Sequence, residues 1–165
     1  MDAIRLLALT GCRENEILSL KWDYVDFDKQ CFRFPTTKTG PQIRPFGLGA
    51  KHILERIKQN SSSEWVFPSN RGTGHFISIL KVLNKIMKLK GDNQQPFINK
   101  DICIHTLRHS FASIAADKGY IELIISGLLG HKPKGVTNRY SHTPDASLIL
   151  AANDISLHIE KLLDD

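Results

Sequence analysis

The stretch from residue 104 to residue 140 constrains the fold of this chain most strongly, because its apolar side chains recur at helical spacing. The apolar positions are Ile104, Leu107, Phe111, Ile114 and Ala115. A recurrence every three or four residues predicts an amphipathic helix that packs against a core. Glycine readily adopts the left-handed conformation that ends helices, so we expect this helix to end at Gly119 and the next one at Gly130.

Polar side chains in the same stretch stand at spacings that allow them to converge. His105, Arg108 and His109 lie three and four residues apart, on another face of the first helix. His131 follows the second helix, and Tyr140 comes nine residues later, where a turn and a short helical segment would return its hydroxyl to the cluster. Each of these residues alone is more often structural, but the ordered set is much more specific.

This order resembles the C-terminal catalytic core of the tyrosine recombinase, or phage integrase, family. The matching segments are His-x-x-Arg at 105–108, Leu-Gly-His at 129–131 and the tyrosine at position 140. The resemblance implies an enzyme of a phage or another prokaryotic mobile element that breaks and rejoins DNA strands. It also implies that Tyr140 is the nucleophile and that His109 supports the structure.

The segment at 10–16, Thr-Gly-Cys-Arg-Glu-Asn-Glu, adds a second match. Arg13 and Glu16 stand one helical turn apart, which is consistent with a surface ion pair worth well under about 1 kcal/mol. A second interpretation is a guanidinium held in place by a partly buried carboxylate. The segment resembles the family's Thr-Gly-x-Arg-x-x-Glu box, which implies that Arg13 is catalytic and that Glu16 supports it.

Alternating side chains predict a β-hairpin in the first third of the chain. Residues 31–34 and 42–46 alternate around a glycine-containing turn at 36–41. Pro35 and Pro45 favour strand ends or edge positions. A lysine at a hairpin tip is ordinarily a solvated charge, but Lys38 matches the family's Thr-Lys-Thr-Gly turn, in which the lysine reaches the scissile phosphate.

The remaining periodicity predicts a single α+β, mainly helical domain over residues 1–165. We expect further helices over 2–10, 50–60, 77–87 and 147–163, the last of them broken near Asn153 and Asp154. The apolar run at 65–67 is expected to add a third strand. The resulting fold is a helical core with a small antiparallel sheet of about three short strands on one side.

Breaking a phosphodiester without a metal requires a nucleophile, fixed cations on the nonbridging oxygens and an acid for the leaving oxygen. The resemblance implies a catalytic set of Arg13, Lys38, His105, Arg108, His131 and Tyr140. In this set the two arginines bind phosphate oxygens through forked donors. His105 takes or shares the phenolic proton, His131 donates to a nonbridging oxygen, and Lys38 protonates the leaving 5′ oxygen.

The product of this reaction is a 3′-phosphotyrosyl intermediate, which a second 5′ hydroxyl attacks to complete strand exchange. No carboxylate cluster of the nuclease type accompanies the set, so we expect neither a metal nor another cofactor.

The net charge of +5 permits a polyanionic partner, which here is expected to be double-stranded DNA. Candidate phosphate contacts are Lys81, Lys85, Lys88 and Arg139, although a lysine-rich helix face is usually only a solvated one. Three widely spaced cysteines fit the reducing cytoplasm. No apolar run approaches the roughly 18 residues of a membrane span, so no membrane partner is expected.

Two other functions remain open for this sequence. One is a type IB topoisomerase-like enzyme, which shares the chemistry but rejoins the same strands, and the other is a noncatalytic DNA-binding module that retains the site. Family members usually carry a helical N-terminal core-binding domain, which we expect to be absent because the chain begins at the helix before Arg13. The full-length protein is expected to form a homotetramer on synapsed DNA, and this chain to be monomeric without DNA.

Overall fold

The computed structural model describes residues 2–37, 40–69, 72–88, 103–131 and 145–164. Its helices are α1 (Asp2–Thr10), α2 (Glu14–Leu18), the 3-10 helix η1 (Trp22–Tyr24), α3 (Leu48–Gln59), α4 (Leu80–Met87), α5 (Ile104–Asp117), α6 (Glu122–Leu129) and α7 (Ala146–Asp164). Its strands are β1 (Val25–Asp26), β2 (Cys31–Phe34) and β3 (Gln42–Pro45). This arrangement confirms the mainly helical α+β fold predicted from the sequence.

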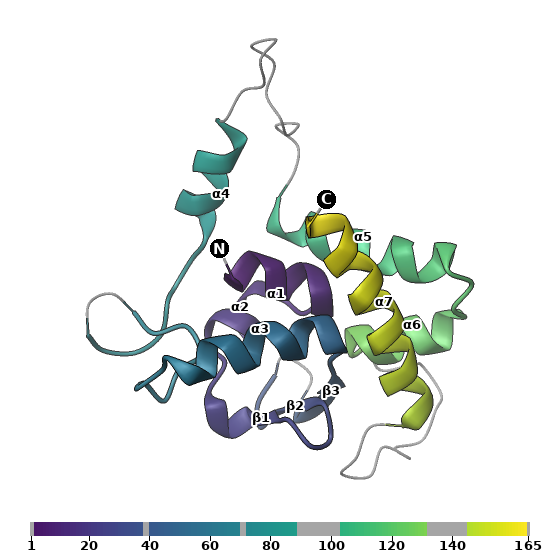
Figure 1. Ribbon diagram of the computed structural model, residues 1–165, viewed down its shortest axis with the longest axis horizontal. Helices are drawn as coiled ribbons and strands as arrows, with labels where there is room; N and C mark the ends of the chain where they lie inside the picture. The colour runs from purple at the N-terminus through teal and green to yellow at the C-terminus, as the bar shows by residue number, and fades with distance from the viewer. Residues whose placement is uncertain (1, 38–39, 70–71, 89–102, 132–144, 165) are drawn as a thin grey trace.

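The three strands form one antiparallel sheet in the order β1-β2-β3, below the helices in Figure 1. In the β2–β3 pair, Phe32 lies opposite Arg44 and Cys31 lies opposite Pro45. Pro45 therefore ends an edge strand, the position that a residue without a backbone donor tolerates. The hairpin predicted from the alternating residues is confirmed.

The third strand is not the one that the apolar run at 65–67 predicted. Val25–Asp26 fills that place, while Trp65 forms only an isolated bridge with Lys21. Val66 is nevertheless buried, because its amide donates to the carbonyl of Leu20 and its side chain joins the core. The apolar run therefore reflects core packing more than strand formation.

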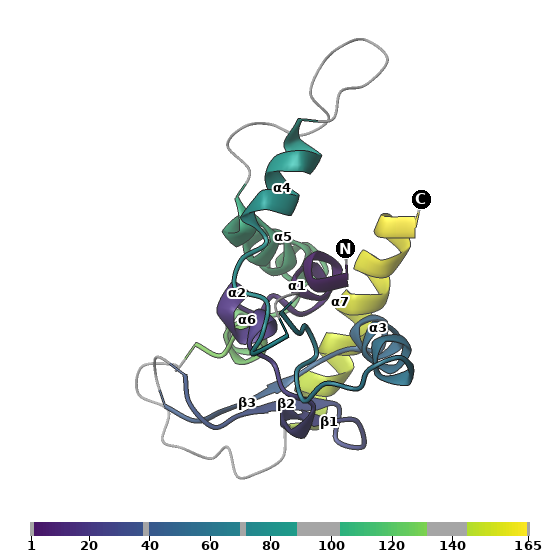
Figure 2. The same ribbon diagram turned by 90° about the vertical axis from the view of Figure 1, so that its left-hand side faces the viewer.

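Helix α1 lies at the centre of the helical part and contacts α3, α5 and α7 (Figure 1). Leu6, Leu7 and Leu9 are almost completely buried along it. Helix α4 projects from the body in both views (Figures 1 and 2), and its buried side includes Leu83. The two helices predicted to end at Gly119 and Gly130 are confirmed, with both glycines at positive φ.

Helix α7 runs unbroken from Ala146 to Asp164, so the break expected near Asn153 and Asp154 is wrong. It packs beside α3 and buries Leu148, Ala151, Ala152, Ile155, Ser156 and Ile159. Gly47 and Gly49 allow the close approach, since a Cβ at Gly47 would overlap the Ala152 carbonyl oxygen. Within the described residues, no helix is long and apolar enough to cross a membrane.

Candidate active site

The end of α1 places Arg13 at the start of α2. Gly11 adopts φ 60°, a left-handed conformation that glycine tolerates best, and its amide donates to the Leu7 carbonyl. A Cβ at Gly11 would lie 2.8 Å from the Phe111 ring and 2.9 Å from Leu129. The turn between the two helices therefore fits closely against α5 and α6, and Arg13 follows it as the N-cap residue of α2.

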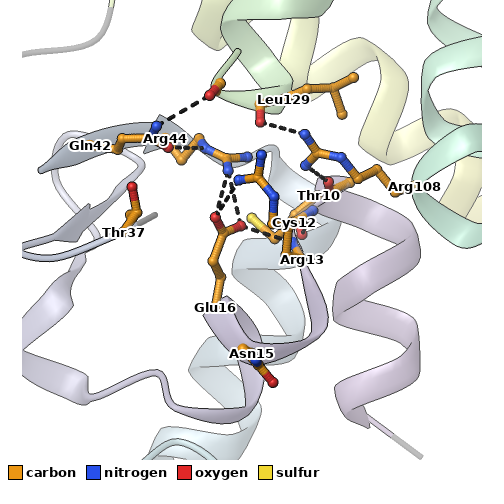
Figure 3. A network of polar contacts seen from close by, with 12 residues as sticks. Thr10, Cys12, Arg13, Asn15, Glu16, Thr37, Gln42, Arg44, Arg108 and Leu129 are labelled. Atoms are coloured by element: carbon orange, nitrogen blue, oxygen red, sulfur yellow. Dashed lines mark hydrogen bonds and ion pairs between the residues drawn. The ribbon is translucent and has the colours of Figure 1, made fainter. Parts of the chain in front are cut away.

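Glu16 binds Arg13 twice and a second arginine as well. Its Oε2 accepts from the Arg13 amide at 2.8 Å, and its Oε1 accepts from Arg13 Nη1 at 2.8 Å. Arg44 Nη2 lies 3.0 and 2.9 Å from the two carboxylate oxygens. Figure 3 shows both guanidiniums beside the one carboxylate. The ion pair is the partly buried kind, since the Glu16 side chain is 10% exposed.

Arg44, on β3, was missed by the sequence reasoning. Its side chain is fully buried, and it also donates to Gln42 Oε1 at 3.2 Å and to the Leu128 carbonyl at 3.4 Å. Strand alternation gave no signal for it, because positions 44, 45 and 46 are all buried and its partner Glu16 lies 28 positions away in the sequence. A buried charge needs a partner of opposite sign, and Glu16 supplies it.

Side chains from two other elements, β3 and α5, meet at the end of α6. The carbonyls of Leu128, Leu129 and Gly130 accept, respectively, from Arg44 Nη1 at 3.4 Å, Arg108 Nη2 at 2.8 Å and Gln42 Nε2 at 3.2 Å. Carbonyls at a helix C-terminus lack partners within the helix and carry partial negative charge. Cationic and amide donors therefore suit this end, and they tie α5 and β3 to the residue that follows, His131.

Arg108 is buried on α5 and reaches across the site. Its Nη1 donates to the Gly11 carbonyl at 2.6 Å, and its Nη2 lies 2.9 Å from His131 Nε2. Burial, with the nearby guanidiniums of Arg44 and Arg13, lowers the pKa of Arg108 to about 10. The side chain still carries its charge at neutral pH. Arg13 and Arg44 thus share one carboxylate, and the charge of Arg108 lies near both of them, so there is an excess of positive charge that favours an anionic ligand.

His131 is held in its neutral form by the same surroundings. Partial desolvation lowers the pKa of His131, and the charges of Arg108, Arg13 and Arg44 lower it further. Nε2 of the neutral ring accepts from Arg108, so the ring proton sits on Nδ1. A hydrogen bond from His131 to a phosphate oxygen is thus available from Nδ1.

The other predicted catalytic and supporting residues are exposed or fall outside the described residues. His105 and His109 are exposed on α5, with their ring centroids 4.8 Å apart in an edge-to-face arrangement. Lys38, Tyr140 and Arg139 fall outside the described residues. The ends of the turn that carries Lys38 are tied together, because the Gly40 amide donates to the Thr37 carbonyl at 3.1 Å.

The candidate DNA-contact lysines on α4 are exposed. Lys81, Lys85 and Lys88 all lie on the outer side of the helix or at its end, opposite the buried Leu83. This placement fits both a solvated face and a phosphate-binding face, so their role stays a prediction. Across the described residues, no group of three or more histidines, cysteines and acidic residues is arranged to hold a metal ion.

The sequence matches known proteins along most of its length. Residues 2–146 match the model of the phage integrase family. The chain is 30% identical over 145 residues to prophage integrase IntF of Escherichia coli, which covers 83% of this chain and 29% of that protein. It is also 30% identical over 141 residues to tyrosine recombinase XerA of Saccharolobus solfataricus, covering 84% and 44%. The chain thus spans less than half the length of either relative.

Solved structures share the fold at lower sequence identity. The integrase of the Tn1549 transposon, in complex with circular intermediate DNA, superposes with a TM-score of 0.65 at 19% identity, covering 89% of this chain and 54% of that one. A lambda integrase tetramer bound to a Holliday junction gives a TM-score of 0.56 at 21% identity, covering 85% and 43%. The family match over residues 2–146, together with this shared fold, shows that the chain belongs to the phage integrase family.

Proposed function

We propose that this chain is the catalytic domain of a site-specific DNA recombinase that cleaves and rejoins strands through a 3′-phosphotyrosyl intermediate. The observation that carries the proposal is the clustering of Arg13, Arg108 and His131, since Arg108 Nη2 lies 2.9 Å from His131 Nε2 and the charges of both arginines lower the pKa of His131. Two guanidiniums and an imidazole at one point suit a phosphodiester, whose transition state places negative charge on its nonbridging oxygens. The matched relatives, an integrase and a recombinase, favour strand exchange over topoisomerase-like rejoining.

In the proposed reaction, the phenolic oxygen of Tyr140 attacks phosphorus, and the bond between phosphorus and the 5′ oxygen breaks. His105 accepts the phenolic proton, and Lys38 gives a proton to the leaving oxygen. Arg13 and Arg108 bind the nonbridging oxygens through the donors that their protein contacts leave available. A 5′ hydroxyl of another strand then attacks the phosphotyrosine, so the energy of the phosphodiester is retained.

The partner in this proposal is double-stranded DNA, and the assembly on synapsed DNA is a homotetramer of the full-length protein. The solved structures support this partner, since one is a transposon integrase with DNA and another a tetramer on a Holliday junction. Without DNA we expect the chain to be monomeric. We place the protein in the cytoplasm, where the free thiols of Cys12, Cys31 and Cys103 stay reduced.

The test replaces only the nucleophilic oxygen. Tyr140→Phe keeps the aromatic ring, so the variant is expected to fold as the wild type does and to form no covalent adduct on a nicked suicide substrate carrying the cognate site. Tyr120→Phe is the matched control, because the Tyr120 hydroxyl donates to Asp154 at 2.9 Å on the α5–α7 side of the molecule. Denaturing gels report the adduct. An undiminished adduct in Tyr140→Phe would assign the nucleophile to another residue.

A further inference from the structure

We propose that Arg44 is a positioning residue, which fixes the phosphate-binding guanidinium of Arg13 by holding Glu16 from the opposite side. The inference rests on the proposed function, because it concerns the same site. Arg44 is itself fully buried, whereas the Arg13 side chain is 37% exposed and accessible to a ligand. Arg44 therefore acts on the reaction through Glu16 and Arg13, without touching DNA.

The geometry of the carboxylate supports this chain of contacts. Arg44 Nη2 lies within 3.0 Å of both Glu16 oxygens, so it holds the end of the carboxylate through both of them. Arg13 then meets Oε1 through Nη1 and Oε2 through its backbone amide. A guanidinium is planar and has five N–H donors. When Glu16 holds Nη1 of Arg13, the remaining donors of Arg13 keep a fixed direction in which they can bind a phosphate.

Helix α2 is too short to fix Glu16 by itself. It has five residues, and isolated helices of this length are not stable in water. Its position must come from tertiary contacts, and the Arg44–Glu16 pair joins it to the sheet across 28 positions of sequence. The carboxylate on which Arg13 depends is thus held from β3, in addition to the burial of Ile17 and Leu18 of α2 in the core.

Arg44 is well placed to serve as this fixed point. Its backbone is paired with Phe32 of β2, and its guanidinium is held by Gln42 and the Leu128 carbonyl. Gly130 lies so close that a Cβ there would overlap Arg44 Nε. These contacts come from the sheet and from the end of α6, and together they restrict the movement of the Arg44 guanidinium.

The first measurement needs no DNA. Nitrogen-15 NMR of the arginine Nε–H groups reports how well Arg13 is ordered, and Arg13→Lys assigns its signal. In Arg44→Met we expect the Arg13 signal to broaden or to exchange with solvent at least tenfold faster. If Arg44→Met does not fold, Arg44→Lys takes its place, because it keeps the charge but loses the separate donors to Gln42 and the Leu128 carbonyl. The Arg13 signal is again expected to broaden or to exchange faster. An unchanged Arg13 signal in a folded Arg44 variant overturns the proposal.

The matched control is Arg33→Met. Arg33 lies on the neighbouring strand β2 and pairs with Asp26 at 2.8 Å, so its loss also removes an arginine–carboxylate pair from the sheet. Arg33→Met is expected to leave the Arg13 signal unchanged. Broadening of that signal by equal amounts in the Arg33 and Arg44 variants would mean that any damage to the sheet suffices, and it would overturn a specific role for Arg44.

The second measurement separates positioning from general structural damage. On the suicide substrate, Arg44→Met is expected to slow cleavage by about tenfold to a hundredfold, the size that misplacement of a binding group produces. In an Arg13→Ala background the same substitution is expected to slow it by less than about twofold, because the group that it positions is already missing. Equal slowing in both backgrounds overturns the proposal. If the wild type forms no adduct, the proposed function fails, and the NMR result still decides whether Arg44 orders Arg13.

Discussion

At the scale of single residues, the candidate active site contains a glycine that is packed against one of its charged groups. Gly130 ends α6 at φ 66°, in the left-handed region, and lies against the guanidinium of Arg44. Any side chain here has two costs, one from the backbone conformation and one from the crowding of Arg44. Gly119 provides a comparison, because its φ is 84° but a Cβ would meet nothing within 4 Å.

Gly130→Ala is therefore expected to destabilise the protein more than Gly119→Ala does. The left-handed conformation costs an alanine about 1–2 kcal/mol, which both variants bear. Crowding adds about 1–3 kcal/mol in Gly130→Ala alone. Urea denaturation followed by circular dichroism measures both free energies of unfolding. Equal losses in the two variants would show that Arg44 moves aside at little cost.

At the scale of elements, α7 caps α3 from outside. The N-cap of α3 is Gly47, which has no side chain to accept from the first amides of the helix. Ser156 Oγ, fully buried on α7, accepts from the Ala50 amide at 3.2 Å instead. The two helices are thus joined by a capping hydrogen bond as well as by apolar contacts.

Removing the Ser156 hydroxyl is expected to lower the free energy of unfolding by about 1–2 kcal/mol, the range for loss of a helix cap or of a buried hydrogen-bond partner. The variant is Ser156→Ala, and its control is Ser110→Ala on the exposed face of α5. The control is expected to stay within about 0.5 kcal/mol of the wild type. Hydrogen exchange at the Ala50 amide, faster in Ser156→Ala alone, would locate the effect. A loss no larger than that of the control would refute the capping role.

Sequence patterns predicted those elements whose periodicity is long and regular. The apolar stripe of α5 and the glycine that ends α6 are both found in the structure. Strand β1 has two residues, too few to show an alternation. The polar pair in α7 suggested a break because its partners are distant in sequence: Asn153 accepts from Gln30, and Asp154 accepts from Tyr120 and pairs with Lys118.

Only those contacts of the candidate site that are close in sequence were predictable. Arg13 and Glu16 are close in sequence, and the ion pair expected from their spacing is present. The link from Glu16 to Arg44 joins α2 to a strand of the sheet, and the spacing of residues carries no information on such a contact. The roles assigned to Lys38 and Tyr140 stay predictions, since both lie outside the described residues.

At the scale of the whole molecule, a projecting helix carries a group of three lysines. Helix α4 extends from the body in Figure 2, with Lys81, Lys85 and Lys88 exposed. A lysine that binds a DNA phosphate releases condensed counterions, so the DNA affinity falls with salt. The slope of affinity against salt concentration therefore reports how many phosphates the protein binds.

Replacing the three lysines of α4 by alanine is expected to weaken binding to a cognate duplex and to reduce the logarithmic salt slope by about 0.9 for each phosphate that is no longer bound. The control replaces three exposed lysines from other parts of the chain, Lys29, Lys58 and Lys161, with the same change in net charge. Sedimentation velocity across a salt series measures the binding and also the assembly, which is expected to be monomeric without DNA. Equal slopes in the two triple variants would mean that α4 lies away from the duplex.

The contact between α3 and α7 has a consequence for the way this sequence can diverge. At Gly47 and Gly49 the backbone of one helix lies against the other, and a Cβ would meet Ala152 or Ser156. Every other amino acid is larger than glycine, so we expect substitutions at these two positions to be selected against. On the outer side of α7, by contrast, Leu150 and Leu162 are exposed, so no contact of this kind limits the size of their side chains. Among homologues in which α3 packs against α7 in this way, we expect the inner face of α7 to keep its small residues, while the residues of its outer face differ widely.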